Sequence, residues 1–245
     1  MLTQRRAAVL PALTVLILTV TGCTTIDQAI ADGDGKPPAS AAPSAGQAVT
    51  SDGMNYVPLA EAIARLTVAP EHVGGYNRHA FKHWNAGLIP DDGCNTRAEV
   101  LIAEAVKPPT IGGGCKLTGG EWLSYYDNIT VNDPAKLDID HMVPLEEAWS
   151  SGAYAWNPGR REAYANDLAE TRSLVAVTAK TNRSKGKRDP AEWLPPAFGA
   201  LCTYLEDWTT VKLRWSLTAD QAEHDTLVRR AKECPDSTVT YELAP

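Results

Sequence analysis

The sequence predicts an α+β domain in which several helices accompany a few short strands. Two longer helices are expected near residues 200–215 and 218–232, at the end of the chain, and Thr218 can cap the second. Short runs with the composition or alternation of β-strands occur at residues 121–126, 137–141 and 174–177. Because helices are mixed with only a few short strands, we expect the α+β class.

The first residues have the features of an export signal. Two arginines precede a nearly unbroken apolar run at residues 7–20, which is too short to cross a bilayer comfortably. The tetrapeptide Val20-Thr21-Gly22-Cys23 resembles the lipobox of bacterial lipoproteins, in which the cysteine becomes the lipidated N-terminus. We therefore expect a signal peptide over residues 1–22 and lipidation of Cys23, with an ordinary cleavage site as the alternative. The protein is then anchored to the outer face of the bacterial cell membrane, or secreted.

Residues 23–52 are expected to form a flexible tether, because they contain almost no large apolar side chain. The remaining residues, 53–245, number about 190 and suit one domain with a sizeable core. This domain contains Cys94, Cys115, Cys202 and Cys234. An even number of cysteines in an exported chain indicates two disulfides, for which three connectivities exist. We favour Cys94–Cys115 and Cys202–Cys234, since each closes a local loop.

Helix signals mark the first half of the domain. Residues 58–66 have apolar side chains at helical spacing, and Pro58 suits a first turn. Residues 96–106 are also expected to be helical, with Thr96 as N-cap and Glu99 at capping-box spacing.

Two short strands and a helix are expected in the second half. The strand at residues 137–141 ends before Pro144, and the strand at 174–177 leads into a helix with Thr178 as N-cap and Gly186 at its end. Further helical segments are expected over residues 145–149, 160–168 and 190–194.

Side chains suited to metal chemistry occur on these elements. The first strand ends in Asp140 and His141, and the helix after the second strand carries Asn182. Aspartate and asparagine oxygens are hard donors that suit Mg²⁺ or a similar divalent ion. A neutral imidazole beside such an ion can take a proton from water near neutral pH.

The charge distribution is uneven. The net charge of −7 argues against a nucleic-acid partner. Residues 172–188, however, contain six basic residues and no acidic one, although such a run can also be a solvated helix face. These basic residues are Arg172, Lys180, Arg183, Lys185, Lys187 and Arg188.

The stretch DIDHMVP, followed downstream by LVAVTAKTNRSKG, resembles the ββα-metal motif of HNH endonucleases. The longer pattern is similar to a branch of exported bacterial HNH proteins related to the C-terminal nuclease domain of GmrSD-type restriction enzymes. It covers roughly residues 76–196, with its core at about 121–196. The resemblance implies a ββα-metal (HNH, or His-Me finger) core in a mostly helical domain. It also implies a metal-dependent endonuclease that hydrolyses phosphodiester bonds of DNA.

The resemblance assigns roles to individual residues. His141 matches the general base, and Asp140 and Asn182 match the ligands of one divalent ion, which is Mg²⁺ in the first instance, with Mn²⁺ or another divalent ion as alternatives. Such an ion stabilises charge at the scissile phosphate. Three basic residues fall where phosphate contacts are useful. They are Arg183, Lys185 and Lys187.

One position departs from the pattern of the family. The residue that orients the histidine is usually an asparagine before the second strand, and the matching residue here is Ser173. Ser173 can still form a hydrogen bond, and Asn166 or Asp167 can serve instead. Asp138 is either a third ligand or a residue that supports the ligands.

The expected partners are nucleic acid, DNA in the first instance, and a membrane through the lipid anchor, and no protein partner is implied. The alternative function is a non-catalytic nucleic-acid-binding surface lipoprotein. A structural lipoprotein of the cell envelope is a third reading. The sequence leaves open whether DNA or RNA, single-stranded or double-stranded, is the substrate.

Overall fold

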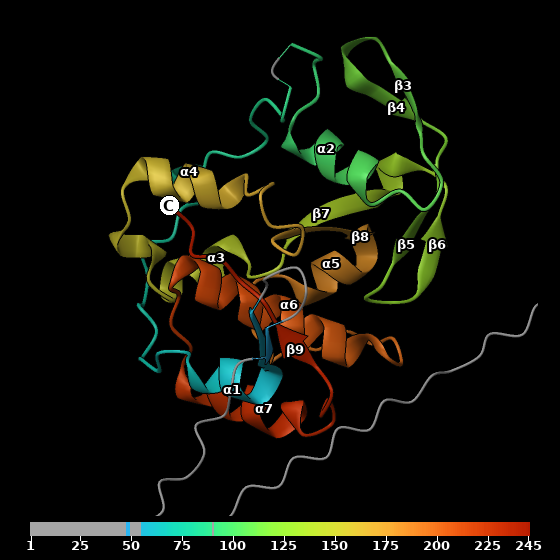
Figure 1. Ribbon diagram of the computed structural model, residues 1–245. Helices are drawn as coiled ribbons and strands as arrows, with labels where there is room; N and C mark the ends of the chain where they lie inside the picture. The colour runs from blue at the N-terminus through green and yellow to red at the C-terminus, as the bar shows by residue number, and fades with distance from the viewer. Residues whose placement is uncertain (1–47, 50–54, 90) are drawn as a thin grey trace, which may run out of the picture. The chain divides into compact units, whose positions relative to one another are not determined.

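The computed structural model describes residues 48–49, 55–89 and 91–245 (Figure 1). The expected signal peptide, Cys23 and nearly all of the expected tether lie outside these residues. Within the described part of the chain, no helix has the length and apolar character that crossing a membrane requires.

The fold combines seven α-helices with short antiparallel strands in the described residues. The helices are α1 (Leu59–Ala64), α2 (Thr96–Ala103), α3 (Leu145–Ser150), α4 (Pro158–Ala165), α5 (Ala179–Lys185), α6 (Ala200–Trp215) and α7 (Gln221–Ala231). The strands are β1 (Ala48–Val49), β2 (Asn55–Pro58), β3 (Thr110–Gly112), β4 (Lys116–Thr118), β5 (Trp122–Ser124), β6 (Ile129–Val131), β7 (Leu137–His141), β8 (Leu174–Thr178) and β9 (Thr238–Val239). Strands β1, β2 and β9 form one sheet, and β3–β4, β5–β6 and β7–β8 form pairs. The predicted α+β class is confirmed.

The β7–β8 pair and helix α5 position the predicted site. The two strands are antiparallel, with Asp140 opposite Val175 and His141 opposite Leu174. Helix α5 begins directly after β8 and packs against both strands (Figure 1). As predicted, the Thr178 side chain caps α5 by accepting a hydrogen bond from the backbone N–H of Thr181. A strand pair and a helix therefore bring the end of β7 next to the first turns of α5.

Strand β8 is buried on both of its faces. Val175 and Val177 contribute to the main apolar core, which includes helix α6. Leu174 and Ala176 point to the other face and join a second cluster that contains Trp122. The β8 strand is therefore a continuous apolar run rather than an alternating one. Burial on both sides fixes the strand, and with it the start of α5.

Two predicted helix caps are wrong. Asn95, not Thr96, caps α2, because the Asn95 side chain accepts a hydrogen bond from a backbone N–H of the first turn. The carboxylate of Glu99 bonds to a backbone N–H in the loop before the helix instead of closing a capping box. Helix α7 is capped by Asp220 rather than by Thr218. In both cases a better acceptor near the expected cap takes the role.

Both predicted disulfides are present. Cys94–Cys115 joins the loop before α2 to the β3–β4 hairpin, with Cα atoms 4.9 Å apart. Cys202–Cys234 joins the start of α6 to the segment after α7, with Cα atoms 5.5 Å apart. Residues 190–194 form a turn, as expected, which is closed by the N–H groups of Glu192 and Trp193 on the carbonyl of Asp189.

Candidate active site

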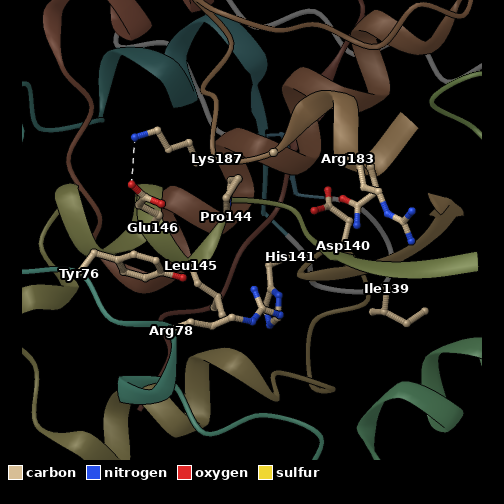
Figure 2. A pocket seen from close by; sticks show the side chains of 12 residues that line it. Tyr76, Arg78, Ile139, Asp140, His141, Pro144, Leu145, Glu146, Arg183 and Lys187 are labelled. Carbon is tan, nitrogen blue, oxygen red and sulfur yellow. Dashed lines mark hydrogen bonds and ion pairs between the residues drawn. The ribbon is translucent and has the colours of Figure 1, made fainter. Parts of the chain in front are cut away.

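Three predicted residues lie on one cavity. Asp140 and His141 come from the end of β7 and Asn182 from α5, and all three line a cavity of about 410 Å³ (Figure 2). The cavity is also lined by Tyr76, Arg78, Ile139, Pro144, Leu145, Glu146, Arg183, Gly186 and Lys187. The strand–helix geometry thus brings together side chains that are far apart in the sequence.

The histidine of this site is held in one tautomer. The Nε2 atom of His141 lies 3.0 Å from the backbone carbonyl oxygen of Ala165. Because a carbonyl oxygen can only accept, Nε2 carries the proton and Nδ1 is left as an acceptor. The imidazole is only 6% exposed and stacks between the rings of Trp84 and Tyr164. Burial lowers the pKa of His141 to about 3, so the ring is neutral at neutral pH.

The carbonyl that holds His141 belongs to a helix end. Ala165 is the last residue of α4, a helix that starts with Asn157 as N-cap and Pro158 in the first turn. The last carbonyls of a helix have no partner within the helix, so this one is free to accept the imidazole N–H. The negative end of the helix dipole also stabilises a histidine that has taken up a proton.

Ser173 and Asp167 do not orient the histidine. The Oγ atom of Ser173 donates a hydrogen bond of 2.8 Å to Asp167. The Asp167 carboxylate is further occupied by two nitrogens of Arg214 and by the indole N–H of Trp215. No hydrogen bond among the described residues joins either side chain to His141. The predicted orienting role is therefore wrong for Ser173 and Asp167, which belong to a buried structural network.

Asn166 has a structural role as well. Its amide oxygen accepts hydrogen bonds from the backbone N–H of Asn85 and the hydroxyl of Thr96. Its amide nitrogen donates to the carbonyls of Lys82 and Glu162. All its polar atoms are thus used to tie the segment before α2 to α4, and the predicted contact with the histidine is wrong. The neighbouring carbonyl of Ala165 provides that contact, and a backbone group leaves no signal in a sequence.

Two side chains hold one oxygen of the Asp140 carboxylate. Its Oδ2 accepts a hydrogen bond of 2.7 Å from the hydroxyl of Tyr126 and forms an ion pair with Lys185. Burial raises the pKa of the Asp140 carboxyl, and the Lys185 ammonium opposes this effect. Within the described part of the chain, Oδ1 has no hydrogen-bond partner, which leaves it available to a ligand in the cavity.

Lys185 cannot contact a phosphate, contrary to the prediction. Its side chain is fully buried, and besides the ion pair with Asp140 its ammonium donates to the carbonyls of His141 and Met142. The ammonium also lies over the ring of Tyr204, 5.8 Å from the centroid. The last turn of α5 points this residue at the strands and at α6. Lys185 is therefore an internal counter-ion of Asp140.

The other two basic residues expected to contact phosphate, Arg183 and Lys187, do line the cavity, and each lies near a carboxylate. The Nε atom of Arg183 lies 3.9 Å from Asp138. The Nζ atom of Lys187 lies 2.9 Å from Glu146, as the dashed line in Figure 2 marks. Both basic side chains are largely exposed. Asp138 also accepts a hydrogen bond of 3.2 Å from the amide of Asn182. Asp138 thus supports Asn182 and directs the Asn182 amide oxygen away from itself.

Two cavity residues were missed by the sequence reasoning. Tyr76 and Arg78 come from the segment before α2, and Figure 2 shows both beside Leu145 and His141. Both lie at the start of the region that resembles the family, but the resemblance assigned them no role, and the composition of residues 76–84 is only aromatic and basic. Their position depends on the tertiary fold.

The donor set fits a hard divalent ion. The free Oδ1 of Asp140 and the amide oxygen of Asn182 are oxygen donors on one cavity, and the Asp138 carboxylate is adjacent. Mg²⁺ binds through few protein oxygens and keeps several waters, so two or three such donors suffice.

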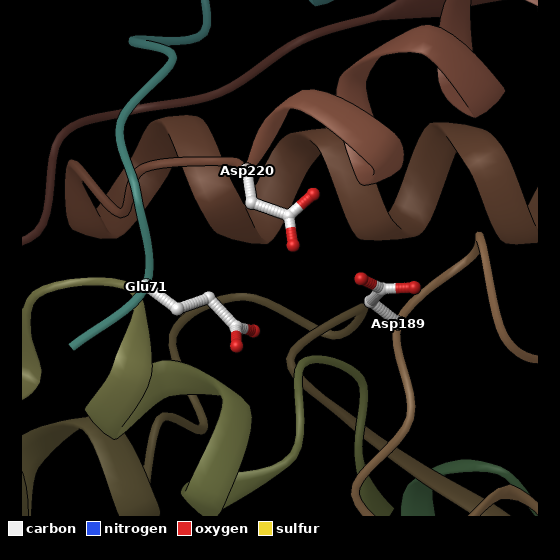
Figure 3. A group of neighbouring side chains, drawn as sticks. All are labelled: Glu71, Asp189 and Asp220. Atoms are coloured by element: carbon white, nitrogen blue, oxygen red, sulfur yellow. The ribbon is translucent and has the colours of Figure 1, made fainter. Parts of the chain in front are cut away.

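A separate group of carboxylates lies on a neighbouring cavity. Glu71, Asp189 and Asp220 each present an oxygen, and these oxygens lie within 4.8 Å of one another (Figure 3). Burial, together with the nearby Glu147, raises the pKa of Glu71 to about 7. The group contains neither Asp140 nor His141, and of its members Glu71 is exposed, Asp220 is half-buried and Asp189 is buried.

Comparison with known proteins places the site in a recognised domain. The family described as GmrSD restriction endonucleases, C-terminal domain, matches residues 116–230. A protein of Arthroderma benhamiae described as an uncharacterized secreted protein is 38% identical over 173 residues, which is 70% of this chain and 82% of the relative. Residues 116–230 of the chain are therefore similar to the GmrSD C-terminal domain. No solved structure matches the chain.

The GmrSD C-terminal domain contains the whole β7–β8–α5 unit with Asp140, His141 and Asn182. The description of the matching family names restriction endonucleases. Tyr76 and Arg78 precede the matched region, although they line the same cavity.

Proposed function

We propose that this protein is a metal-dependent HNH-type endonuclease that hydrolyses phosphodiester bonds of DNA. The observation that carries the proposal is one cavity lined by His141, whose Nδ1 is left as an acceptor, together with Asp140 and Asn182. A neutral base and hard oxygen donors on one cavity are the groups that metal-assisted hydrolysis of a phosphodiester needs.

His141 acts as the general base. Its Nδ1 takes a proton from a water molecule, and the resulting hydroxide attacks the phosphorus of the substrate. The Ala165 carbonyl keeps the reacting nitrogen directed at the cavity and, as part of a helix end, stabilises the imidazolium that forms. Burial between Trp84 and Tyr164 prevents the ring from rotating.

Asp140 and Asn182 hold the divalent ion, which we take to be Mg²⁺, and Asp138 supports Asn182. When bound, the ion stabilises negative charge on the phosphate and on the leaving oxygen. Lys185 and Tyr126 fix the Asp140 carboxylate through one oxygen and leave the other for the ion.

The surroundings of the cavity and the relative support a nucleic-acid substrate outside the cell. Arg183 and Lys187 place positive charge at the cavity despite the net charge of −7. The relative described as secreted and the two disulfides both favour export. Anchoring through Cys23 remains a prediction.

The decisive test is cleavage of supercoiled plasmid by the purified protein across Mg²⁺, Mn²⁺, Ca²⁺ and Zn²⁺. We expect nicking with Mg²⁺ or Mn²⁺, and no nicking with EDTA or with the His141→Ala variant. His224→Ala, on α7, is the matched control and keeps full activity. Equal cleavage by His141→Ala refutes the mechanism. Salt-sensitive DNA binding without cleavage under any metal favours instead a non-catalytic nucleic-acid-binding protein.

A further inference from the structure

Arg78 differs from the other basic residues of the cavity. Arg183 and Lys187 each face a carboxylate of the cavity wall. Among the described residues, no carboxylate lies within ion-pair distance of Arg78, although its side chain lines the same cavity as His141 (Figure 2). A guanidinium without a carboxylate partner keeps its donors and its charge for another anion.

One contact of Arg78 is with a second histidine. Nδ1 of His83 lies 2.8 Å from the carbonyl oxygen of Phe81, so this nitrogen carries the proton. In the neutral ring Nε2 is then an acceptor, and it lies 3.4 Å from Nη2 of Arg78. One edge of the guanidinium is therefore held by a neutral acceptor that does not cancel its charge.

The segment that carries Arg78 is fixed to the same structure that holds His141. Arg78 begins a short 3₁₀ turn, η1 (Arg78–Ala80), and the carbonyl of Ala80 accepts a hydrogen bond from Arg161 of α4. Phe81, directly after the turn, is fully buried and packs edge-on against Tyr164. Tyr164 in turn stacks on His141. Arg78 and the general base thus share one rigid support.

We propose that Arg78 binds a phosphate group of the nucleic-acid substrate in this cavity and that His83 positions its guanidinium for that contact. The proposal rests on the proposed nuclease function and extends it to a residue outside the region matched by the GmrSD C-terminal domain. Arg78 supplies the uncompensated positive charge of the site, whereas Arg183 and Lys187 first have to leave their carboxylates.

Binding without metal tests the phosphate contact directly. The His141→Ala protein is titrated in EDTA with a fluorescein-labelled oligonucleotide, single-stranded and duplex, at several salt concentrations. Adding Arg78→Ala should reduce the slope of log K against log salt by about 1, the value for one phosphate contact. Arg65→Ala is the matched control, because Arg65 pairs with Glu61 on α1 and does not line the cavity. An unchanged slope for Arg78→Ala overturns the proposal.

Cleavage kinetics add a second measure. Losing a charge-assisted contact to phosphate should lower kcat/KM about 10-fold to 100-fold in Arg78→Ala. Arg78→Lys should restore the salt slope but only part of kcat/KM, since an ammonium lacks the two parallel donors of a guanidinium. Equal kcat/KM for the parent and Arg78→Ala overturns the assignment.

A double-mutant cycle tests the positioning role of His83. His83→Leu should lower kcat/KM in the parent and have no effect in the Arg78→Ala background, because it acts through Arg78. His83→Gln should largely retain the activity, since its amide can still present an acceptor to Arg78. An equal loss from His83→Leu in both backgrounds overturns the positioning role.

The two proposals fail in different ways. If the parent protein cleaves DNA and Arg78→Ala leaves the salt slope unchanged, the nuclease function stands and the role of Arg78 is wrong. If no metal supports cleavage but Arg78→Ala still reduces the slope, the nuclease function is wrong and the phosphate contact stands.

Discussion

The imidazole Nε2 of His141 lies 3.0 Å from the carbonyl oxygen of Ala165, at the end of α4. A backbone carbonyl therefore selects the tautomer of this ring, a role that the sequence pattern led us to expect from a side chain. Residues that contact His141 are therefore distinct from residues that only stabilise the fold around it. Substitutions in the two groups should have different effects on catalysis and on stability.

Ser173→Ala should affect stability and not catalysis. The change removes one hydrogen bond to Asp167, which keeps its contacts with Arg214 and Trp215. We expect a loss of about 1 kcal/mol in the free energy of unfolding, or roughly 2–4 °C in Tm. Plasmid cleavage should stay within about twofold of the parent, because a group that does not contact the base has no part in the proton transfer. A large loss of cleavage in a folded Ser173→Ala protein contradicts this assignment.

Replacing Lys185 should lower the folding stability much more than replacing Lys187, which lies two positions further along the chain. Lys185→Met leaves the buried Asp140 carboxylate without its counter-ion, which should cost about 3–5 kcal/mol of folding stability. Lys187→Met removes only an exposed ion pair with Glu146 and should cost less than about 1 kcal/mol. Chemical denaturation followed by tryptophan fluorescence measures both changes. If the two variants are equally stable, Lys185 is not an internal counter-ion.

The different environments of Lys185, which is buried, and Lys187, which is exposed, show where sequence reasoning succeeded and where it failed. Strands β7 and β8 and the Thr178 cap follow from local patterns, namely the order of apolar and polar residues and a hydroxyl before a helix. The two disulfides follow from local loops. Which side of α5 is buried depends on β7 and α6, so the basic residues expected to contact phosphate included a fully buried one, Lys185.

The remaining site residues were beyond the reach of the sequence for two physical reasons. Ala165 acts through a backbone group that every residue has, so its identity carries no signal. Arg78 reaches the cavity from a segment far away in the chain, and its position is set by the packing of Phe81 against α4. Asp140, His141 and Asn182 were found because a known motif fixes their spacing, and the strand–helix unit brings them to one cavity.

The Cys202–Cys234 disulfide should contribute to stability without contributing to the site. It closes a loop with a sequence separation of 32 residues. Replacing both cysteines by serine should lower the free energy of unfolding by about 3–4 kcal/mol, mainly by freeing the unfolded chain. Guanidinium denaturation of the parent and the variant measures the change. Cleavage at 25 °C should persist, since neither cysteine lines the cavity. An unchanged midpoint would contradict the prediction.

Asp207 should make the protein less stable as the pH rises from about 4 to about 7. Burial raises the pKa of its carboxyl to about 7, so over this range the folded protein retains a proton that the unfolded chain has lost. Because the folded state then binds more protons, stability falls with increasing pH, and the loss is complete above the folded pKa. Free energies of unfolding measured at pH 4, 6 and 8 test this dependence.

Asp207→Asn should remove this contribution while keeping the acceptor for the hydroxyl of Tyr125, which lies 3.0 Å from the carboxylate. We expect the variant to equal the parent near pH 4 and to exceed it by roughly 2–4 kcal/mol at pH 8. Glu206→Gln, at the neighbouring and more exposed position, is the control and should follow the parent at every pH. If Asp207→Asn destabilises the protein at pH 8, the carboxylate is ionised and stabilising in the folded state. The burial argument for Asp207 is then wrong.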